Sequence, residues 1–189
     1  RTFSVTAERP SESRFEARSG LSVLPMLGRD EELAFLMGRW RLAKASEGQG
    51  VLLVGDAGIG KSRIVRALLD GIASEPHVRI RYQCSPYHRN SALWPVIQQL
   101  GNAAGFADRD SSDAKLGKLA ALLPRWANDD DTLALLAGLV GLGGALRDGQ
   151  PSLTPQALRA RTLEALIGQL LGAAEREPVL VVLEDAHWT

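Results

Sequence analysis

Eight consecutive residues combine glycines, a lysine and a serine at a spacing that suits phosphate binding: Gly55, Asp56, Ala57, Gly58, Ile59, Gly60, Lys61 and Ser62. Glycines allow successive backbone N–H groups to turn inward and form a nest for an anion. Lys61 can reach the β- and γ-phosphates of a nucleotide, and the Ser62 hydroxyl can bind Mg²⁺. We therefore predict that all eight residues bind nucleotide, that Lys61 also serves catalysis, and that Ser62 is a metal ligand.

The segments on both sides of this loop fit the same interpretation. The run Val51-Leu52-Leu53-Val54 is short and apolar, which is typical of a buried strand. After the loop, apolar residues recur at helical spacing from Ile64 to Ile72. A strand, a glycine-rich turn and a helix give the motif the context that its mechanism needs. The alternative is an ordinary glycine turn, which the flanking pattern disfavours.

A second candidate site follows the apolar run 179–183, where Glu184 and Asp185 come directly after an expected buried strand. In nucleotide hydrolases such a strand brings one carboxylate to the Mg²⁺ shell and another to the attacking water. By position, Glu184 is the expected metal ligand and Asp185 the expected catalytic residue that activates water. The alternative is a pair of solvated acids at the end of a strand.

The order of these two acids suggests a slow reaction. Glu followed by Asp inverts the common Asp-Glu order, and the shorter Asp185 side chain would lie farther from the water. We expect weak steady-state hydrolysis and retained ATP. Fast turnover would contradict this hypothesis.

Alternating strand and helix patterns predict an α/β fold with a mostly parallel sheet. A further strand is expected at 78–83, and a loop follows it from Cys84 to His88. Thr154-Pro155 reads as a helix N-cap followed by proline at the first helical position. The expected helices are 30–45, the helix after Lys61, 92–104, 112–123, 130–140 and 155–174.

The composition excludes few functions but sets limits. The chain has 189 residues, a formal net charge of zero and one cysteine, Cys84. Bulk charge therefore gives no sign of a nucleic-acid or membrane-surface partner. The single cysteine fits a reducing cytoplasm, and neither a membrane span nor a signal peptide is visible. We interpret Cys84 as a core residue at the end of a strand, because Cys84 and His88 alone do not make a metal site.

Four segments together resemble a known family: 26–33 (MLGRDEEL), the loop 55–62 (GDAGIGKS), 82–88 (YQCSPYH) and 183–188 (LEDAHW). They resemble the AAA-like ATPase region of bacterial multidomain signalling proteins, in the STAND group of P-loop NTPases. The most similar subset places this ATPase after a class III adenylate/guanylate cyclase domain and before tetratricopeptide-like repeats. The resemblance implies a three-layer α/β/α fold, with ATP and Mg²⁺ as cofactors. It also implies that Gly28 and Arg29 bind nucleotide near the adenine, although the same residues suit an ordinary helix start.

The resemblance also suggests a domain organisation. Residues 25–189 would form the N-terminal part of the ATPase domain, incomplete at its C-terminus. Residues 1–24 would be the tail of a cyclase-like domain, ending in the strand 1–5, followed by a linker. In this class another strand lies between the phosphate-loop strand and the acidic strand, and we expect that strand, a sensor residue and a lid beyond Thr189. The isolated fragment would then be marginally stable or prone to aggregation.

Several functions remain open from the sequence. The first is an ATP-driven regulatory switch in a cytoplasmic signalling protein, with intramolecular cyclase and repeat domains as partners and a possible homo-oligomer. Alternatives are the ATPase domain of a LuxR-type transcriptional regulator, a nucleotide-binding scaffold without turnover, and a phosphotransferase. The phosphate loop alone does not distinguish ATP from GTP, because only the resemblance points to ATP.

Overall fold

The fold was analysed in a computed structural model that describes residues 28–89, 91, 93–123, 130–143 and 153–188. The chain divides into two compact units, residues 1–75 and residues 76–189. We describe each unit by itself. The expected cyclase-like tail and linker, residues 1–24, lie outside the described residues and stay a prediction.

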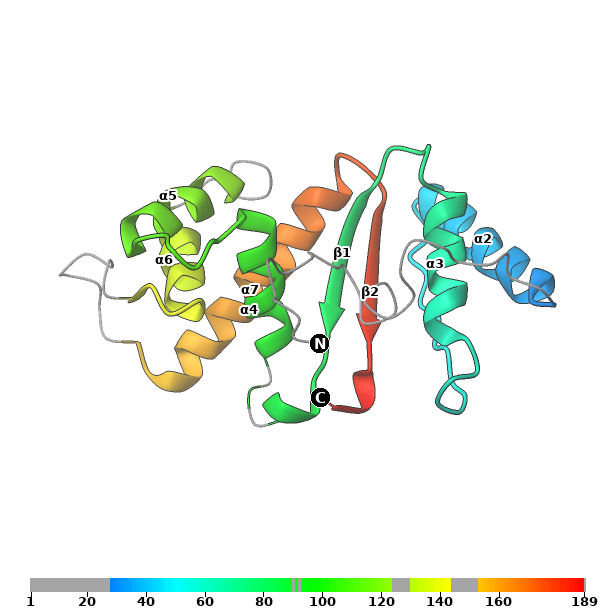
Figure 1. Cartoon of the computed structure of the whole chain (residues 1–189). Helices are drawn as coiled ribbons and strands as arrows, with labels where there is room; N and C mark the ends of the chain where they lie inside the picture. Colours follow the sequence, from blue (N-terminus) through cyan, green and yellow to red (C-terminus); the bar gives the residue numbers. More distant parts are fainter. Residues whose placement is uncertain (1–27, 90, 92, 124–129, 144–152, 189) are drawn as a thin grey trace. The chain divides into compact units, whose positions relative to one another are not determined.

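The described residues of the first unit form two helices, α2 (Asp30–Lys44) and α3 (Lys61–Gly71) (Figure 1). Both begin where the sequence predicted them. Trp40 of α2 is buried, and its indole N–H donates to the Glu75 carboxylate at 2.7 Å. Lys44 forms an ion pair with the same carboxylate at 2.8 Å. Glu75 therefore links the end of α2 to the segment that follows α3. The phosphate loop lies at the N-terminal end of α3.

The expected strand at 51–54 is not formed among the described residues, so this prediction was wrong. The segment has no strand assignment, and Leu52 and Val54 are 81% and 83% exposed. The physical reason is that an apolar run becomes a strand only when a neighbouring backbone pairs with its N–H and C=O groups. The two strands that the structure describes pair with each other instead.

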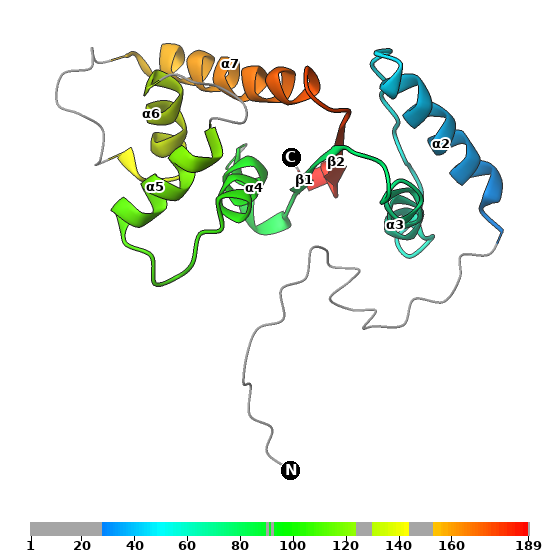
Figure 2. The same ribbon diagram turned by 90° about the horizontal axis from the view of Figure 1, so that it is seen from above.

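The second unit is built on a parallel pair of strands, β1 (Val78–Gln83) and β2 (Val179–Glu184). They lie side by side in both views (Figures 1 and 2), with Val78 opposite Val179 and Gln83 opposite Glu184. The sequence predicted both strands, and their parallel pairing fits the predicted α/β class. Their carboxyl ends lie at the same edge of the sheet, where the short helices η1 (Pro86–His88) and η4 (Ala186–Trp188) follow.

Helices connect the two strands, and two of them lie against one face of the sheet. The connecting helices are α4 (Trp94–Ala104), α5 (Ser112–Leu122), α6 (Asp130–Leu139) and α7 (Pro155–Ala174). Figure 2 shows α4 and α7 on the same side of the sheet. Side chains of these two helices line a small hollow together with Ile80 and Tyr82 of β1. Side chains alternate between the two faces of a strand. The neighbouring residues Arg81 and Gln83 therefore point to the other face.

Local sequence explains where these helices begin. The Thr154 hydroxyl accepts a hydrogen bond from the Ala157 N–H at 3.2 Å, and Pro155 occupies the start of α7. The Ser111 hydroxyl does the same for α5, accepting from the Ala114 N–H. A side-chain cap of this kind satisfies a backbone donor that the first turn leaves without an intrahelical partner.

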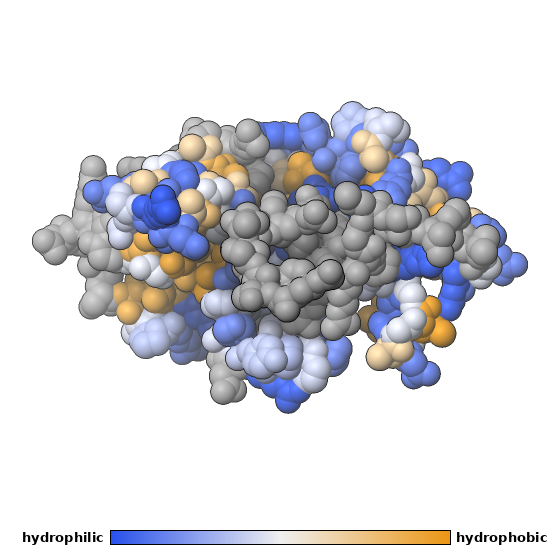
Figure 3. Space-filling model, in the orientation of Figure 1, coloured by the Kyte–Doolittle hydropathy of each residue, from blue (hydrophilic) through white to orange (hydrophobic). Residues whose placement is uncertain are grey.

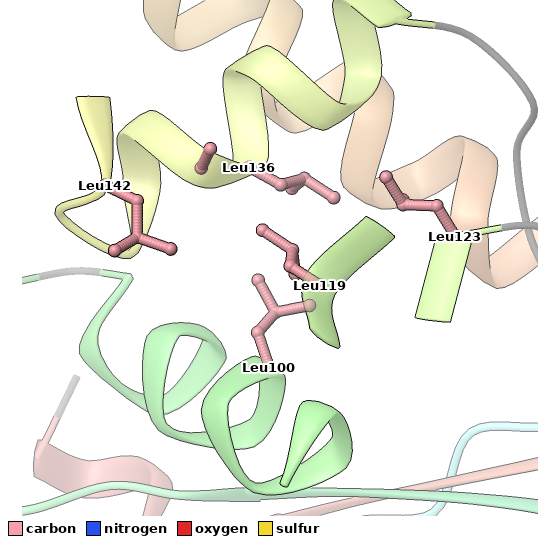
Figure 4. Close-up of a cluster of buried hydrophobic side chains, with 6 residues drawn as sticks. Leu100, Leu119, Leu123, Leu136 and Leu142 are labelled. Atoms are coloured by element: carbon pink, nitrogen blue, oxygen red, sulfur yellow. The ribbon is translucent and has the colours of Figure 1, made fainter. Parts of the chain in front are cut away.

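The core of the second unit lies away from the sheet, between α4, α5 and α6 (Figure 4). Leu119 of α5 and Leu136 of α6 are completely buried, and Leu100 of α4 is 1% exposed. The remaining buried members of this cluster are Leu123, Ala137 and Leu142. Burial of these leucines stabilises the helical insertion between the two strands, whose helices the sequence predicted at 92–104, 112–123 and 130–140.

We expect the substitution Leu119→Ala to lower the free energy of unfolding by about 2–5 kcal/mol, because it leaves a cavity in this cluster. Denaturant titration followed by circular dichroism measures the change. The matched control is Leu158→Ala on α7, where the side chain is 47% exposed and the expected loss is small. Equal losses in the two variants would show that the cluster is not the core of the unit.

The described surface mixes hydrophilic and hydrophobic side chains (Figure 3). Leu163, Ile167 and Leu171 of α7 are 39%, 54% and 60% exposed. On β2, Val181 and Leu183 are 45% and 51% exposed, since β1 is the one strand that the structure pairs with β2. Across the described part of the chain, no helix is both long and apolar enough to cross a membrane.

Candidate nucleotide site and acidic strand end

The loop 55–62 has the backbone conformation that its glycines allow. Gly58 and Gly60 have φ values of +84° and +104°, a region that other residues rarely adopt. A Cβ atom built at Gly55 would lie 3.0 Å from Cγ2 of Ile59, so a side chain there would displace the Ile59 side chain slightly. Positions 58 and 60 favour glycine because of their φ values, in agreement with the sequence motif.

The first turn of α3 is suited to receive an anion. Gly60 caps the helix without a side-chain hydrogen bond, and no acidic residue lies in the first turn. The first turn of α2 differs, because Asp30, Glu31 and Glu32 place their own negative charges there. A helix N-terminus carries unpaired N–H groups and a partial positive charge, which favour a bound phosphate. Of these two helix starts, that of α3 is the one left open to an anion.

Lys61 is held over the loop by backbone carbonyls. Its ammonium group donates to the carbonyl oxygen of Gly55 at 2.7 Å and to that of Asp56 at 2.9 Å. These contacts keep a positive charge at the mouth of the loop. An incoming phosphate would meet this charge together with the N–H groups at the start of α3.

Arg29 connects the segment before α2 to the same loop. Its guanidinium donates to the Ile59 carbonyl at 3.3 Å and to the Glu32 carboxylate at 2.7 Å. The hydrogen bond from Arg29 is the main reason that the pKa of Glu32 lies below its usual value. Gly28 precedes this contact with φ +71°. Arg29 therefore lies beside the loop, while the predicted binding of adenine by Gly28 and Arg29 stays a prediction.

At the end of β2, Glu184 forms an ion pair with Arg81 of β1. Arg81 Nη2 lies 2.6 Å from Glu184 Oε2, and the two side chains are only 18% and 13% exposed. Arg81 is opposite Val182 in the register, so its long side chain reaches along the sheet toward the strand end. The residue predicted to bind the metal is thus already engaged by a cation of the neighbouring strand.

Asp185 is held by the next polar residue of β1. The side-chain amide nitrogen of Gln83 (Nε2) donates to Asp185 Oδ2 at 3.0 Å. The side-chain oxygen of Gln83 (Oε1) is buried and has no hydrogen-bond partner among the described residues. Asp185 has φ +55°, in the left-handed region that Asp and Asn tolerate better than most residues. The Gln83 contact and this turn fix the direction of the carboxylate.

Aromatic and cationic side chains pack around this strand end. The Arg89 guanidinium lies 4.1 Å from the centre of the Trp188 ring, and His88 stacks on Trp94 at 3.7 Å. Cys84 beneath them is 1% exposed, as expected for a strand-end core residue. Burial, and then the charge of Asp185, raise the pKa of the Cys84 thiol. This packing anchors η1 and η4 at the carboxyl ends of the two strands.

The structure brings some predicted residues together and leaves others apart. The eight loop residues form one continuous cradle in the first unit, next to Arg29. Glu184 and Asp185 lie together in the second unit. Sequence reasoning missed Arg81 and Gln83. Period-2 alternation along 78–83 would have placed both on one face, but nothing in the sequence gives the register with 179–184.

Each unit carries oxygen donors of the kind that Mg²⁺ prefers. They are the Ser62 hydroxyl in the first unit and the carboxylates of Glu184 and Asp185 in the second. No group of three or more His, Cys, Asp or Glu side chains in the described residues is arranged to hold a metal ion. Mg²⁺ at phosphate sites uses one or two protein ligands, with phosphate oxygens and water supplying the others.

Comparison with known proteins places the chain in a family. Residues 25–189 match the family described as the AAA ATPase domain. An uncharacterised protein of Rhizobium meliloti (strain 1021) is 31% identical over 166 residues. That match covers 87% of this chain but only 16% of the relative, so this chain spans a small part of the relative's length. No solved structure matches the chain.

Proposed function

Because the chain belongs to the AAA ATPase domain family, we propose that it binds ATP with Mg²⁺ and hydrolyses it slowly. The observation that carries this proposal is the cradle at 55–62, with positive φ values at Gly58 and Gly60 and the Lys61 ammonium above its carbonyls. The acid-free first turn of α3 supports the same conclusion.

We assign roles to residues by their chemistry. Backbone N–H groups of the loop and Lys61 bind the phosphates, and the Ser62 hydroxyl and the Glu184 carboxylate serve the magnesium ion. When bound, the ion neutralises charge on the phosphate oxygens. Asp185 orients the attacking water and accepts its proton. Gly28 and Arg29 contribute to nucleotide binding next to the loop.

A three-layer α/β/α arrangement would suit these roles, since such folds bind ligands at the carboxyl ends of parallel strands. The carboxyl end of β2 carries both acids, in agreement with this rule. The shorter reach of Asp185 and its hydrogen bond to Gln83 favour slow turnover.

A regulatory switch is the role that fits slow hydrolysis best. The relative from Rhizobium meliloti is several times longer than the matched region, which agrees with an ATPase that acts on other domains of a large protein. We propose that ATP stabilises one state and hydrolysis resets it. A linked nucleotide cyclase and repeat domains are the partners that the resemblance suggests, and the compartment would be the cytoplasm.

Titration of the purified chain with ATP and with GTP, each with and without Mg²⁺, tests the proposal by calorimetry. We expect saturable binding of ATP that strengthens with Mg²⁺, and release of phosphate at a low rate. Absence of nucleotide binding would contradict the proposal. Binding without any phosphate release would favour the scaffold without turnover.

A further inference from the structure

The strand β1 carries two polar residues that engage both acids of β2. Arg81 pairs with Glu184 at 2.6 Å, and Gln83 donates to Asp185 at 3.0 Å. Both contacts lie on the face of β1 opposite Ile80 and Tyr82, which line the hollow with α4 and α7. The acids are thus restrained by a strand that lies more than a hundred residues earlier in the chain; Gln83 and Asp185 are 102 positions apart.

We propose that Arg81 competes with Mg²⁺ for Glu184. While the ion pair is formed, the Glu184 carboxylate is not available to the metal, and it becomes available when nucleotide and metal bind together. This inference rests on the proposed role of Glu184 as a metal ligand. Glu184 Oε2 is paired with the guanidinium, and this positive charge next to the carboxylate opposes the approach of a second cation. Arg81 is therefore a positioning residue that sets the metal requirement of the site.

Burial makes this competition effective. An ion pair between exposed side chains contributes little, because water screens it. Arg81 and Glu184 are 18% and 13% exposed, so their interaction is stronger than a surface pair and costs more to break. Mg²⁺ alone must displace the guanidinium, whereas Mg²⁺ that arrives with phosphate oxygens already in its shell needs fewer protein ligands. The ion pair would therefore favour the metal–nucleotide complex over the free metal.

The test measures nucleotide binding rather than turnover. A fluorescent ATP analogue is titrated with Mg²⁺, and the Mg²⁺ concentration for half-maximal enhancement of binding is compared between wild type and Arg81→Gln. We expect this concentration to fall about tenfold or more in the variant, the lower end of the effect expected for one charged hydrogen bond. Arg79→Gln is the matched control, because it removes the same charge from the same face of β1. Arg79 is opposite Leu180 in the register, farther from the acids.

Two further variants sharpen the result. In a Glu184→Gln background, Arg81→Gln should no longer shift the Mg²⁺ requirement, because the ion pair between Arg81 and Glu184 is already lost. Arg81→Lys should fall between wild type and Arg81→Gln, since an ammonium keeps the charge but not the planar fork. If circular dichroism shows that Arg81→Gln does not fold, the Mg²⁺ requirement is compared between Arg81→Lys and its control Arg79→Lys instead.

The outcomes separate this inference from the proposed function. No nucleotide binding by wild type would overturn both. Normal Mg²⁺-dependent binding by wild type, with an unchanged or higher Mg²⁺ requirement in Arg81→Gln, would overturn the competition alone. An equal shift in Arg79→Gln would also overturn it, because the effect would then come from general loss of positive charge.

Discussion

The substitution Lys61→Met is expected to weaken ATP binding about 10- to 100-fold, the effect of losing one hydrogen bond from a charged donor to phosphate. Methionine keeps an unbranched apolar stem of similar length but removes the ammonium group. In the structure that group is held by the carbonyl oxygens of Gly55 and Asp56. Calorimetric titration with ATP in the presence of Mg²⁺ measures the change.

The control for this variant lies on the same helix. Arg66→Met also removes a positive charge from α3, but Arg66 is paired with Asp70 one turn later. We expect ATP affinity in Arg66→Met to stay close to wild type, with both variants folded by circular dichroism. ATP binding by Lys61→Met at wild-type strength would show that the loop does not use Lys61 to hold phosphate.

Helices, strands and the loop could be predicted from the sequence because their signals are local. Thr154 and Pro155 mark the start of α7 within two residues, and the glycines at 58 and 60 allow the positive φ values of the loop itself. The two paired strands are apolar runs or alternating runs bounded by Pro or polar residues. Each of these features depends on interactions between residues close in the chain.

The parts that could not be predicted depend on pairing across long separations. The run 51–54 has the composition of a strand, but no strand formed because its ladder needs a partner that local pattern does not supply. The hydrogen bond that Gln83 donates to Asp185 could not be predicted either, because the two residues are 102 positions apart in the chain. A register shift of one residue would place Arg81 and Gln83 on the other face. Sequence therefore identified the acids but not the residues that hold them.

The substitution Asp185→Asn is expected to reduce the rate of ATP hydrolysis about 10²–10⁴-fold, the usual contribution of a general base, while ATP binding stays within a small factor of wild type. Asparagine suits the site structurally. Its side-chain oxygen can still accept the hydrogen bond from Gln83, and it tolerates the φ of +55° at this position. The variant therefore removes the proton acceptor and leaves the turn in place.

Single-turnover phosphate release, together with calorimetric ATP titration, separates the possible roles of the acidic strand end. Asp113→Asn, in the first turn of α5, is a matched control that should leave both measurements unchanged. If Asp185→Asn abolishes hydrolysis and keeps binding, Asp185 is the residue that activates water and the switch mechanism is supported. If wild type and Asp185→Asn release phosphate equally slowly, the chain acts as a nucleotide-binding scaffold, and the restraint by Gln83 holds a side chain with no catalytic task. Because asparagine preserves the contact and the backbone conformation, a difference between the two proteins would come from the lost carboxylate and not from a change in fold.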